Sequence, residues 1–386
     1  MIYFQSLTNI LYCKDAVISS ILREVFCLNE YKVGIIGATG MVGQRFVTLL
    51  SGHPWFKISA LAASANSAGK SYEHALAERW VMSTPIPEKI KNMPVFDADT
   101  DAEKVAAAAD FVFCAISLDK MSTQALEEKY AVLECPLISC NSACRALPDV
   151  PMIIPEVNPE HAEVIAAQRK RLGTKRGFIA VKSNCSIQSY VPALHPLRKF
   201  GLTKALICTY QAISGAGKSF AQWPEMVDNV IPYIPGEEEK SEHEPLKIWG
   251  KVEHGEIVNA ESPLITTQCL RVPVSDGHTA AVFASFEHPP SESEIKELWQ
   301  GFAGKPQQLN LPSAPAQFIR YFDEPNRPQP QLDRDFEHGM GISVGRLRRD
   351  SIFDYKFVCL SHNTIRGAAG GAILLAELLA AKGYFD

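Results

Sequence analysis

The stretch Tyr31-Lys-Val-Gly-Ile-Ile-Gly37-Ala-Thr-Gly40-Met-Val-Gly43 decides the fold of this chain. The apolar run Tyr31–Ile36 predicts a β-strand, and the residues from Met41 to Leu50 have the spacing of a helix. The three glycines lie at the turn between strand and helix, where backbone N–H groups and the positive helix end favour a pyrophosphate. A glycine pattern alone could mark only a tight turn, but a strand before it and a helix after it favour a dinucleotide site.

The residues after this turn predict a parallel, doubly wound α/β sheet of the Rossmann type. The next apolar run, Ile58–Ala63, continues a βαβ unit. Further strands are expected at Asp110–Ile116 and Pro136–Ser139, with a helix at about Thr123–Tyr130 between them. Residues 31–183 therefore form the nucleotide-binding domain in our interpretation.

A second domain is expected over residues 184–362. From Lys204 onward the strands alternate apolar and polar residues and are interrupted by Pro and Gly, which predicts an α+β domain with a largely antiparallel sheet. The expected strands are Ala205–Ile213, Leu264–Val272, Ala280–Phe286, Gly341–Leu347 and Tyr355–Leu360. The Ala- and Leu-rich helix Gly367–Ala381 has almost no charge, so we expect residues 363–386 to return and pack on the first domain.

The composition indicates a soluble protein that acts on small molecules. The chain has 386 residues, 46% of them hydrophobic, which suits two globular domains. A net charge of -5 without a dense run of Lys or Arg argues against nucleic acid or an anionic membrane as partner. No apolar run reaches the roughly 18 residues of a membrane span. Ten cysteines without CxxC pairs predict reduced thiols and a cytoplasmic location.

Residues 1–30 form an extension ahead of the first strand. Three acidic residues and two basic ones occur in it, which disfavours a mitochondrial transit peptide. An appended helix and an over-extended start of the reading frame are the two interpretations. The helical stripe that supports the first consists of Val17, Ile18, Ile21, Leu22, Val25 and Phe26.

The end of the second predicted strand indicates which dinucleotide is bound. An NAD enzyme usually offers Asp or Glu there to the ribose 2′-hydroxyl, but this chain has Ser64-Ala-Asn-Ser67-Ala-Gly69-Lys70. Hydroxyls and a cation suit a 2′-phosphate, which a carboxylate would repel. NADP is therefore the expected cofactor. A polar loop with its lysine in water is the alternative, and use of both NAD and NADP stays open.

Cys185 is the expected nucleophile. It lies in Ser183-Asn-Cys-Ser186, after the apolar run Gly177–Val181 and before an expected helix, whose N-terminus would favour the thiolate. His278, in a Gly-flanked turn, would add a charge partner and a proton carrier. A lone cysteine is more often a small buried apolar residue. Together with Gln211, Arg271 and His278 beside a nucleotide fold, it indicates a thiol enzyme that passes a hydride to or from a nicotinamide.

Other candidate groups have simpler interpretations. Cys140 and Cys144 share helical spacing but lack further ligands nearby, so no metal site is predicted. Glu237–Lys240 is either a solvated run of charges or, because it precedes the predicted helix Glu242–Ile248, a substrate contact. Four further cysteines lie in apolar strands and are expected to serve packing, namely Cys114, Cys208, Cys269 and Cys359.

The motifs together resemble aspartate-β-semialdehyde dehydrogenase, and most of all the branch found in fungi and archaea. They match in order from about residue 31 to the end of the chain. The resemblance implies a Rossmann-type domain followed by a domain like the C-terminal one of glyceraldehyde-3-phosphate dehydrogenase. The matching motifs are Gly37–Gly43, Asn141-Ser-Ala-Cys-Arg145, Pro155-Glu-Val-Asn158, Ser183–Ser186, Gln211–Gly217, Glu237–Lys240, Arg271–His278, Pro328-Gln-Pro330 and Asn363-Thr-Ile-Arg-Gly-Ala-Ala369.

The resemblance implies a role for individual residues in binding the substrate and in catalysis. Cys185 would be the nucleophile, His278 the acid/base, and Gln211 the residue that orients the substrate carbonyl. Arg271 and Glu237 would hold the substrate's carboxylate and amino group, as a guanidinium fork and a carboxylate can. The remaining substrate contacts, those around the phosphate, would be Arg145, Lys240 and Asn141.

The resemblance also implies where the cofactor binds. In this chain Asn66 occupies a place where many bacterial relatives have Arg, and the extension of residues 1–30 departs from the family pattern. Asn363 would lie near the nicotinamide. The full set of expected cofactor contacts is Gly37, Ala38, Thr39, Gly40, Met41, Val42, Gly43, Ser64, Ser67, Lys70, Ser186, Gly215, Gly217 and Asn363.

The implied activity is NADPH-dependent reductive dephosphorylation of L-aspartyl 4-phosphate to L-aspartate 4-semialdehyde, through a thioacyl group on Cys185. This step belongs to lysine, methionine and threonine biosynthesis, and the family implies a homodimer or homotetramer. Three alternatives remain: a CoA-dependent malonyl-type reductase, a non-catalytic NADP-binding sensor, and N-acetyl-γ-glutamyl-phosphate reductase. The last normally has Asn-Pro-Gly-Cys rather than Ser-Asn-Cys-Ser at its nucleophile.

Overall fold

The computed structural model of the chain describes residues 30–386. The extension predicted for residues 1–30, with its apolar stripe from Val17 to Phe26, lies outside the described residues except for Glu30. No helix between residues 30 and 386 combines the length and the apolar content that crossing a membrane requires.

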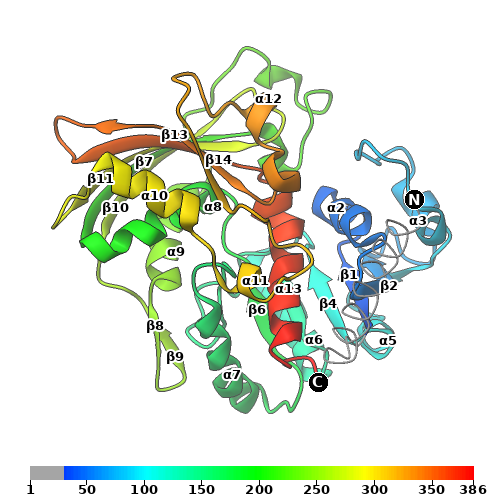
Figure 1. Cartoon of the computed structure of the whole chain (residues 1–386). Coiled ribbons are helices and arrows are strands. Elements are labelled where there is room, and N and C mark those ends of the chain that lie inside the picture. Colours follow the sequence, from blue (N-terminus) through cyan, green and yellow to red (C-terminus); the bar gives the residue numbers. More distant parts are fainter. Residues whose placement is uncertain (1–29) are drawn as a thin grey trace, which may run out of the picture.

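Six parallel strands form the first sheet (Figure 1). The order β3-β2-β1-β4-β5-β6 is that of a doubly wound sheet, in which ligands bind at the carboxyl ends of the strands where the order reverses, between β1 and β4. The predicted parallel fold is therefore confirmed. The strands are β1 Tyr31–Ile36, β2 Phe56–Ala63, β3 Val95–Asp97, β4 Phe111–Cys114, β5 Leu137–Ser139 and β6 Ile179–Val181.

Helices cover both faces of this sheet because successive strand residues point to opposite sides. Val33 and Ile35 of β1 belong to the apolar cluster that contains Phe46 of α2, whereas Ile36 belongs to the cluster that contains Val105 of α5. The first set of helices is α2 Met41–Leu50, α3 Tyr72–Leu76, α4 Glu88–Lys91, α5 Ala102–Ala108, α6 Lys120–Val132 and α7 Ile165–Leu172.

The second sheet is mixed, in the order β10-β7-β11-β14-β13-β12. The three central pairings are antiparallel and the two outer ones are parallel. This agrees with the predicted α+β domain and its largely antiparallel sheet. The strands are β7 Leu202–Gln211, β10 Leu264–Arg271, β11 His278–Phe286, β12 Ile319–Phe322, β13 Ile342–Arg349 and β14 Tyr355–Ser361.

The second half of the chain also contains several helices and a two-stranded hairpin. The helix α8 contacts β11, β13 and β14. The helix α9 begins at Glu237, so the predicted start at Glu242 is wrong. Three glutamates in its first turn favour this earlier start because they interact well with the positive helix end. The remaining elements are α8 Ile187–Leu194, α9 Glu237–Ile248, the hairpin β8 Lys251–Glu253 and β9 Glu256–Val258, α10 Glu292–Gly301, α11 Lys305–Gln308 and α12 Pro330–Asp333.

The chain ends by returning to the first sheet, as predicted. After β14, a π-helical turn over Ile365–Ala369 leads into α13, Gly370–Ala381. Nearly every residue of α13 is buried, and the helix contacts β5. Its Ile373 and Leu375 belong to the apolar cluster of β1 and α2. The C-terminal segment therefore joins the two halves of the molecule next to the carboxyl ends of the first sheet.

Candidate active site

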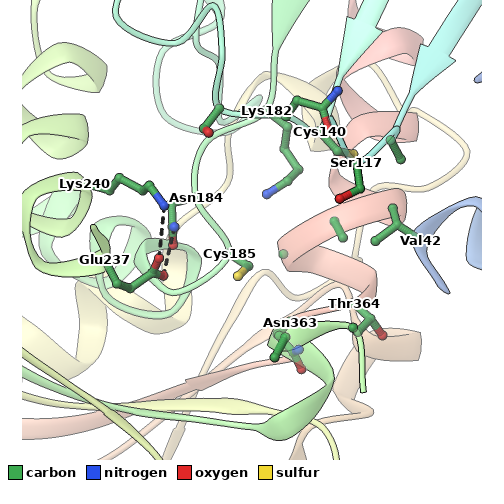
Figure 2. Close-up of a pocket in the computed structure, with 18 of the residues that line it drawn as sticks. Val42, Ser117, Cys140, Lys182, Asn184, Cys185, Glu237, Lys240, Asn363 and Thr364 are labelled. Atoms are coloured by element: carbon green, nitrogen blue, oxygen red, sulfur yellow. Dashed lines mark hydrogen bonds and ion pairs between the residues drawn. The ribbon is translucent and has the colours of Figure 1, made fainter. Parts of the chain in front are cut away.

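A cavity of about 600 Å³ lies where the two sheets meet, and residues from both of them line it (Figure 2). Val42 of α2 and Asn141, which follows β5, come from the first half of the chain. Arg271 ends β10, and Asn363 follows β14. Cys185 also lines the cavity, on the turn between β6 and α8. The fold thus brings the predicted nucleophile and predicted substrate and cofactor residues to one place.

Cys185 lies next to His278, as the predicted catalytic pair requires. The Cys185 Sγ atom is 3.5 Å from His278 Nε2. His278 is the first residue of β11 and is fully buried. It lies behind the sulfur and does not itself line the cavity. Its Nδ1 accepts a hydrogen bond of 3.1 Å from the backbone N–H of Ala212.

Burial favours the neutral form of both members of this pair. Burial raises the pKa of the Cys185 thiol above its ordinary value, and the nearby Glu237 carboxylate raises it further. Burial, with Arg271 as the next cause, lowers the pKa of His278 well below its ordinary value. The direction of the shift at Cys185 is opposite to the predicted lowering of the cysteine pKa, since desolvation outweighs the cations nearby.

Arg271 and Gln211 lie side by side at the ends of two paired strands. They are register partners in the parallel ladder of β10 and β7. The Arg271 guanidinium donates to the carbonyl of Ala212 at 2.8 Å. Gly215 leaves the space for this arrangement, because a Cβ there would lie 2.7 Å from Arg271 Nη1 and 3.0 Å from the His278 ring. The structure thus indicates a steric reason for Gly215, which was predicted as a cofactor contact.

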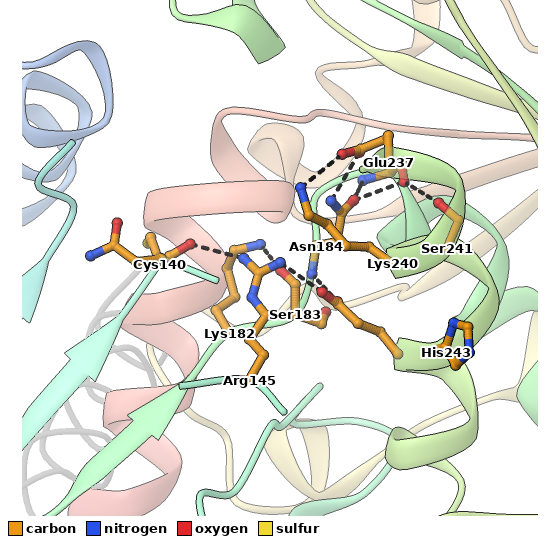
Figure 3. A network of polar contacts seen from close by, with 12 residues as sticks. Cys140, Arg145, Lys182, Ser183, Asn184, Glu237, Lys240, Ser241 and His243 are labelled. Carbon is orange, nitrogen blue, oxygen red and sulfur yellow. Dashed lines mark hydrogen bonds and ion pairs between the residues drawn. The ribbon is translucent and has the colours of Figure 1, made fainter. Parts of the chain in front are cut away.

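Glu237 is buried at the cavity and is held by three side chains (Figures 2 and 3). Its Oε1 accepts hydrogen bonds from Asn184 at 2.9 Å and from Gln211 at 3.2 Å. Lys240, one turn later in α9, lies 3.5 Å from Oε2. Glu237 is therefore not a solvated charge, and its position fits the alternative prediction of a substrate contact.

The residues predicted around the phosphate also line the cavity and have internal partners. Arg145 forms a buried salt bridge of 2.8 Å with Glu244 and donates to the carbonyl of Cys140 (Figure 3). Asn141 donates from Nδ2 to Glu127 at 3.0 Å. These partners hold both side chains in one position before any ligand arrives.

The glycine turn has the features that a pyrophosphate requires. Gly37 has a φ of 87°, and a Cβ at Gly43 would lie 2.1 Å from the carbonyl oxygen of Gly37. The first turn of α2 has no side-chain cap and no acidic residue. Its N–H groups and positive end therefore remain available to an anion. The residues present fit a dinucleotide.

A second cavity of about 470 Å³ extends from the first toward the end of β2. Ile116 and Leu118 line both cavities, and Ser64 lines the second. Ser67 is buried and lines neither, and the Lys70 amine donates to the carbonyl of Asn66 at 2.8 Å. Of these three predicted contacts, the structure therefore places Ser64 at the second cavity, while Ser67 and Lys70 line neither cavity.

Of the remaining predicted cofactor contacts, two line the main cavity and one does not. Asn363 lines the main cavity, with Oδ1 accepting from Gly277 N–H at 2.8 Å and Nδ2 donating to Ser214 at 2.9 Å. Gly217 also lines it. Ser186 is buried and bonds to Asn184 at 2.7 Å, so it supports the nucleophile turn and does not face the cavity.

Comparison with known proteins gives a consistent family. Residues 32–165 match the family described as semialdehyde dehydrogenase, NAD binding domain, and residues 194–366 match semialdehyde dehydrogenase, dimerisation domain. The aspartate-semialdehyde dehydrogenase of Archaeoglobus fulgidus is 43% identical over 91% of this chain and 98% of its own. That of Schizosaccharomyces pombe is 43% identical over the same shares. The chain belongs to the aspartate-semialdehyde dehydrogenase family.

A solved member of the aspartate-semialdehyde dehydrogenase family has the same overall structure. The Candida albicans enzyme, crystallised with NADP, aligns with a TM-score of 0.82 at 40% identity, over 92% of this chain and 99% of that one. The Vibrio cholerae enzyme II aligns with a TM-score of 0.70 at 24% identity and supports the fold alone. The family and the Rossmann-type fold inferred from the motifs are therefore confirmed.

Three residues of this aspartate-semialdehyde dehydrogenase site were missed in the sequence. Lys182 lines the cavity one residue after β6, and a lysine that ends a buried apolar strand was a visible signal. Glu244 is seven residues after Glu237, hence on the same face of α9, which the late predicted helix start concealed. Gly367 reaches the cavity through the π-helical turn, for which the sequence had no signal.

Proposed function

We propose that this chain catalyses reductive dephosphorylation of L-aspartyl 4-phosphate to L-aspartate 4-semialdehyde with NADPH. The observation that carries the proposal is the Cys185–His278 pair, 3.5 Å apart beside a cavity that Arg271 and Val42, from the predicted dinucleotide turn, also line. Family membership agrees with it, as the curated relatives have this name and the Candida albicans structure contains NADP.

Cys185 is proposed as the nucleophile. Its thiolate attacks the acyl carbon, the bond to phosphate breaks, and a thioacyl group remains on the sulfur. Bound NADPH supplies the hydride that reduces this group. His278 serves the reacting atoms from Nε2, as the hydrogen-bond donor or acid that assists release of the aldehyde.

The substrate's charges are proposed to select its position. Arg271 would bind the carboxylate through its fork, and Glu237 would bind the ammonium group. Gln211 would orient the carbonyl, and Arg145, Lys240 and Asn141 would surround the phosphate. Glu237 also argues against the N-acetylated substrate of the alternative reductase, since an acetylated amine has no positive charge to offset this buried carboxylate.

The cofactor contacts are proposed along the glycine turn and the second cavity. Residues Gly37–Gly43 would hold the pyrophosphate, Asn363 would lie near the nicotinamide, and Ser64 would meet the ribose. The proposed set of cofactor contacts also keeps Ser67 and Lys70. It keeps three residues that shape the walls of the site, namely Ser186, Gly215 and Gly217.

The domain division, assembly and location are also proposals. Residues 31–183 with 363–386 would form the nucleotide domain, and residues 184–362 the catalytic domain. The match to a dimerisation domain supports a homo-oligomer. We propose a dimer or tetramer in the cytoplasm, and sedimentation of the purified protein would distinguish the two assemblies.

The test is an assay with aspartate semialdehyde and phosphate that follows reduction of NADP, compared directly with NAD. Turnover is expected with NADP, and Cys185→Ser is expected to lose nearly all of it while still binding the nucleotide. Wild-type turnover in that variant would disprove the thiol assignment. Turnover only with an acyl-CoA or with the N-acetyl-γ-glutamyl substrate would replace the proposed substrate, and nucleotide binding without any turnover would indicate a sensor.

A further inference from the structure

Lys182 is a buried lysine whose side chain reaches the cavity beside the nucleophile. It lies three residues before Cys185, is 2% exposed, and lines the main cavity (Figure 2). Its amine donates to the carbonyl of Ser183. Gly371 lies next to its side chain, since a Cβ at that position would be 3.5 Å from the Lys182 Cδ. Within residues 30–386 no carboxylate forms a salt bridge with Lys182, whereas its neighbour Arg145 is paired with Glu244.

The hydrogen bond that His278 accepts favours the tautomer in which the ring donates to the sulfur. Its Nδ1 accepts the N–H of Ala212 at 3.1 Å, and a backbone N–H can only donate. A neutral imidazole with an acceptor at Nδ1 carries its hydrogen on Nε2. This Nε2–H faces Cys185 Sγ at 3.5 Å. In this tautomer Nε2 donates to a thiolate at Cys185 and so stabilises it.

A buried thiolate is also stabilised by positive charge from other groups nearby. The charged groups that act on Cys185 are Glu237, which opposes ionisation, and Lys182, Arg145 and Arg271, which favour it. Arg145 is paired with Glu244, and Arg271 donates to the carbonyl of Ala212. Among these cations Lys182 lowers the pKa of the Cys185 thiol most.

The pKa of Lys182 itself agrees with this position. Burial lowers it to about 8, and Arg145 lowers it too, while Cys140, Cys185 and Glu244 act in the opposite direction. The ammonium form therefore prevails at neutral pH and is lost as the pH rises through that value. Because linkage is reciprocal, a thiolate at Cys185 must in turn favour the ammonium form of Lys182.

We propose that Lys182 is a positioning residue that sets the ionisation of Cys185, its ammonium stabilising the thiolate while His278 donates to the sulfur from Nε2. The S–H proton leaves to solvent, and Lys182 keeps its own three protons. This inference rests on the proposed role of Cys185 as nucleophile. It assigns the activating charge to a group outside the pair of Cys185 and His278.

The test is the pH dependence of Cys185 alkylation by iodoacetamide in the full-length protein, with the modified peptide identified by mass spectrometry. Lys182→Met should raise the apparent pKa of Cys185 by about one unit, which lowers the alkylation rate near pH 7.5 about tenfold. Lys182→Arg keeps the charge and should restore most of the rate. An unchanged profile in Lys182→Met would overturn the inference. If that variant does not fold, Lys182→Gln gives the same comparison with a polar side chain.

Lys247→Met is the matched control. Lys247 is also buried with a pKa of about 8, but its amine donates to the carbonyls of Arg145, Leu147 and Val150, and it does not line the main cavity. Its loss should lower thermal stability and leave the Cys185 profile in place. An equal shift of the apparent pKa of Cys185 in both variants would mean that Lys182 affects Cys185 only by stabilising the fold, which would overturn the inference. Alkylation needs no substrate, so absence of turnover on aspartate semialdehyde would refute the proposed function without deciding the role of Lys182.

Discussion

Gly367 packs directly against Cys185, since a Cβ at position 367 would lie 2.8 Å from the Cβ of Cys185. The next residue back, Arg366, is fully buried and binds Glu156 with two hydrogen bonds of 2.7 and 2.5 Å. It also donates to Gln188, which in turn donates to Ser183. The π-helical turn before α13 therefore forms the wall behind Cys185 and restricts its position.

Gly367→Ala is expected to reduce both stability and turnover. The added methyl must displace Cys185, and overpacking of this kind costs about 1–3 kcal/mol. Urea unfolding and kcat with aspartate semialdehyde measure the two effects. Gly301→Ala is the control, because a Cβ at that position would meet nothing within 4 Å. Equal behaviour of the two variants would show that the wall behind Cys185 yields easily.

Glu156→Gln should destabilise the protein strongly. Both partners of the Arg366–Glu156 salt bridge are fully buried, so the substitution leaves an uncompensated guanidinium, at a cost of about 3–5 kcal/mol. Lys129→Ala removes an exposed salt bridge of 2.7 Å with Asp99 and should cost less than about 1 kcal/mol. Chemical denaturation gives the free energy of unfolding of both variants. A loss for Glu156→Gln as small as that for Lys129→Ala would contradict the large contribution assigned to the buried salt bridge.

Arg271→Lys should raise KM for aspartate semialdehyde about tenfold or more, a loss of at least about 1.4 kcal/mol of binding. A lysine cannot reproduce the planar fork that we propose for the substrate carboxylate. Steady-state kinetics provide KM and kcat, and a separate titration with NADP should give an unchanged Kd. Wild-type kinetics in this variant would exclude the bidentate role.

Glu127→Gln should change how stability depends on pH. Glu127 is fully buried beneath Asn141, one of its oxygens lacks a partner, and burial raises its pKa above the ordinary 4.5. The folded state thus favours the protonated acid, and the stability it contributes is complete below about pH 4.5 and is lost as the pH rises through the folded-state pKa. The amide stays neutral at every pH.

Melting temperatures from pH 4.5 to 8 test this expectation. The difference between Glu127→Gln and the wild type should move in favour of the variant as the pH rises. Glu128→Gln alters the neighbouring, partly exposed carboxylate and should show no such trend. A constant difference for Glu127→Gln would mean that folding does not shift the pKa of Glu127, and a trend in the opposite direction would mean that Ser139 and Asn141 stabilise the anion.

The local elements near the nucleotide site could be predicted from the sequence because their signals are short-range. The bounds of β1 and α2 agree with the prediction, and those of β2, β4 and β5 differ by at most two residues. The short strand β3 was missed, as three residues show little periodicity. The start of α9 was misplaced because its first turn consists of charged residues without an apolar stripe.

The sequence by itself determined the strand–glycine turn–helix unit, the parallel first sheet and the identity of the motif residues, because apolar periodicity and turn chemistry act over a few neighbouring residues. Only the tertiary structure decided that Cys185 meets His278 93 positions away, that Lys182 reaches the same cavity, and that Arg366 binds Glu156 210 positions away. It also decided that burial favours the neutral forms of Cys185 and His278. Proximity between remote segments and the loss of water around a charge arise only when the whole chain packs, so no local pattern encodes them.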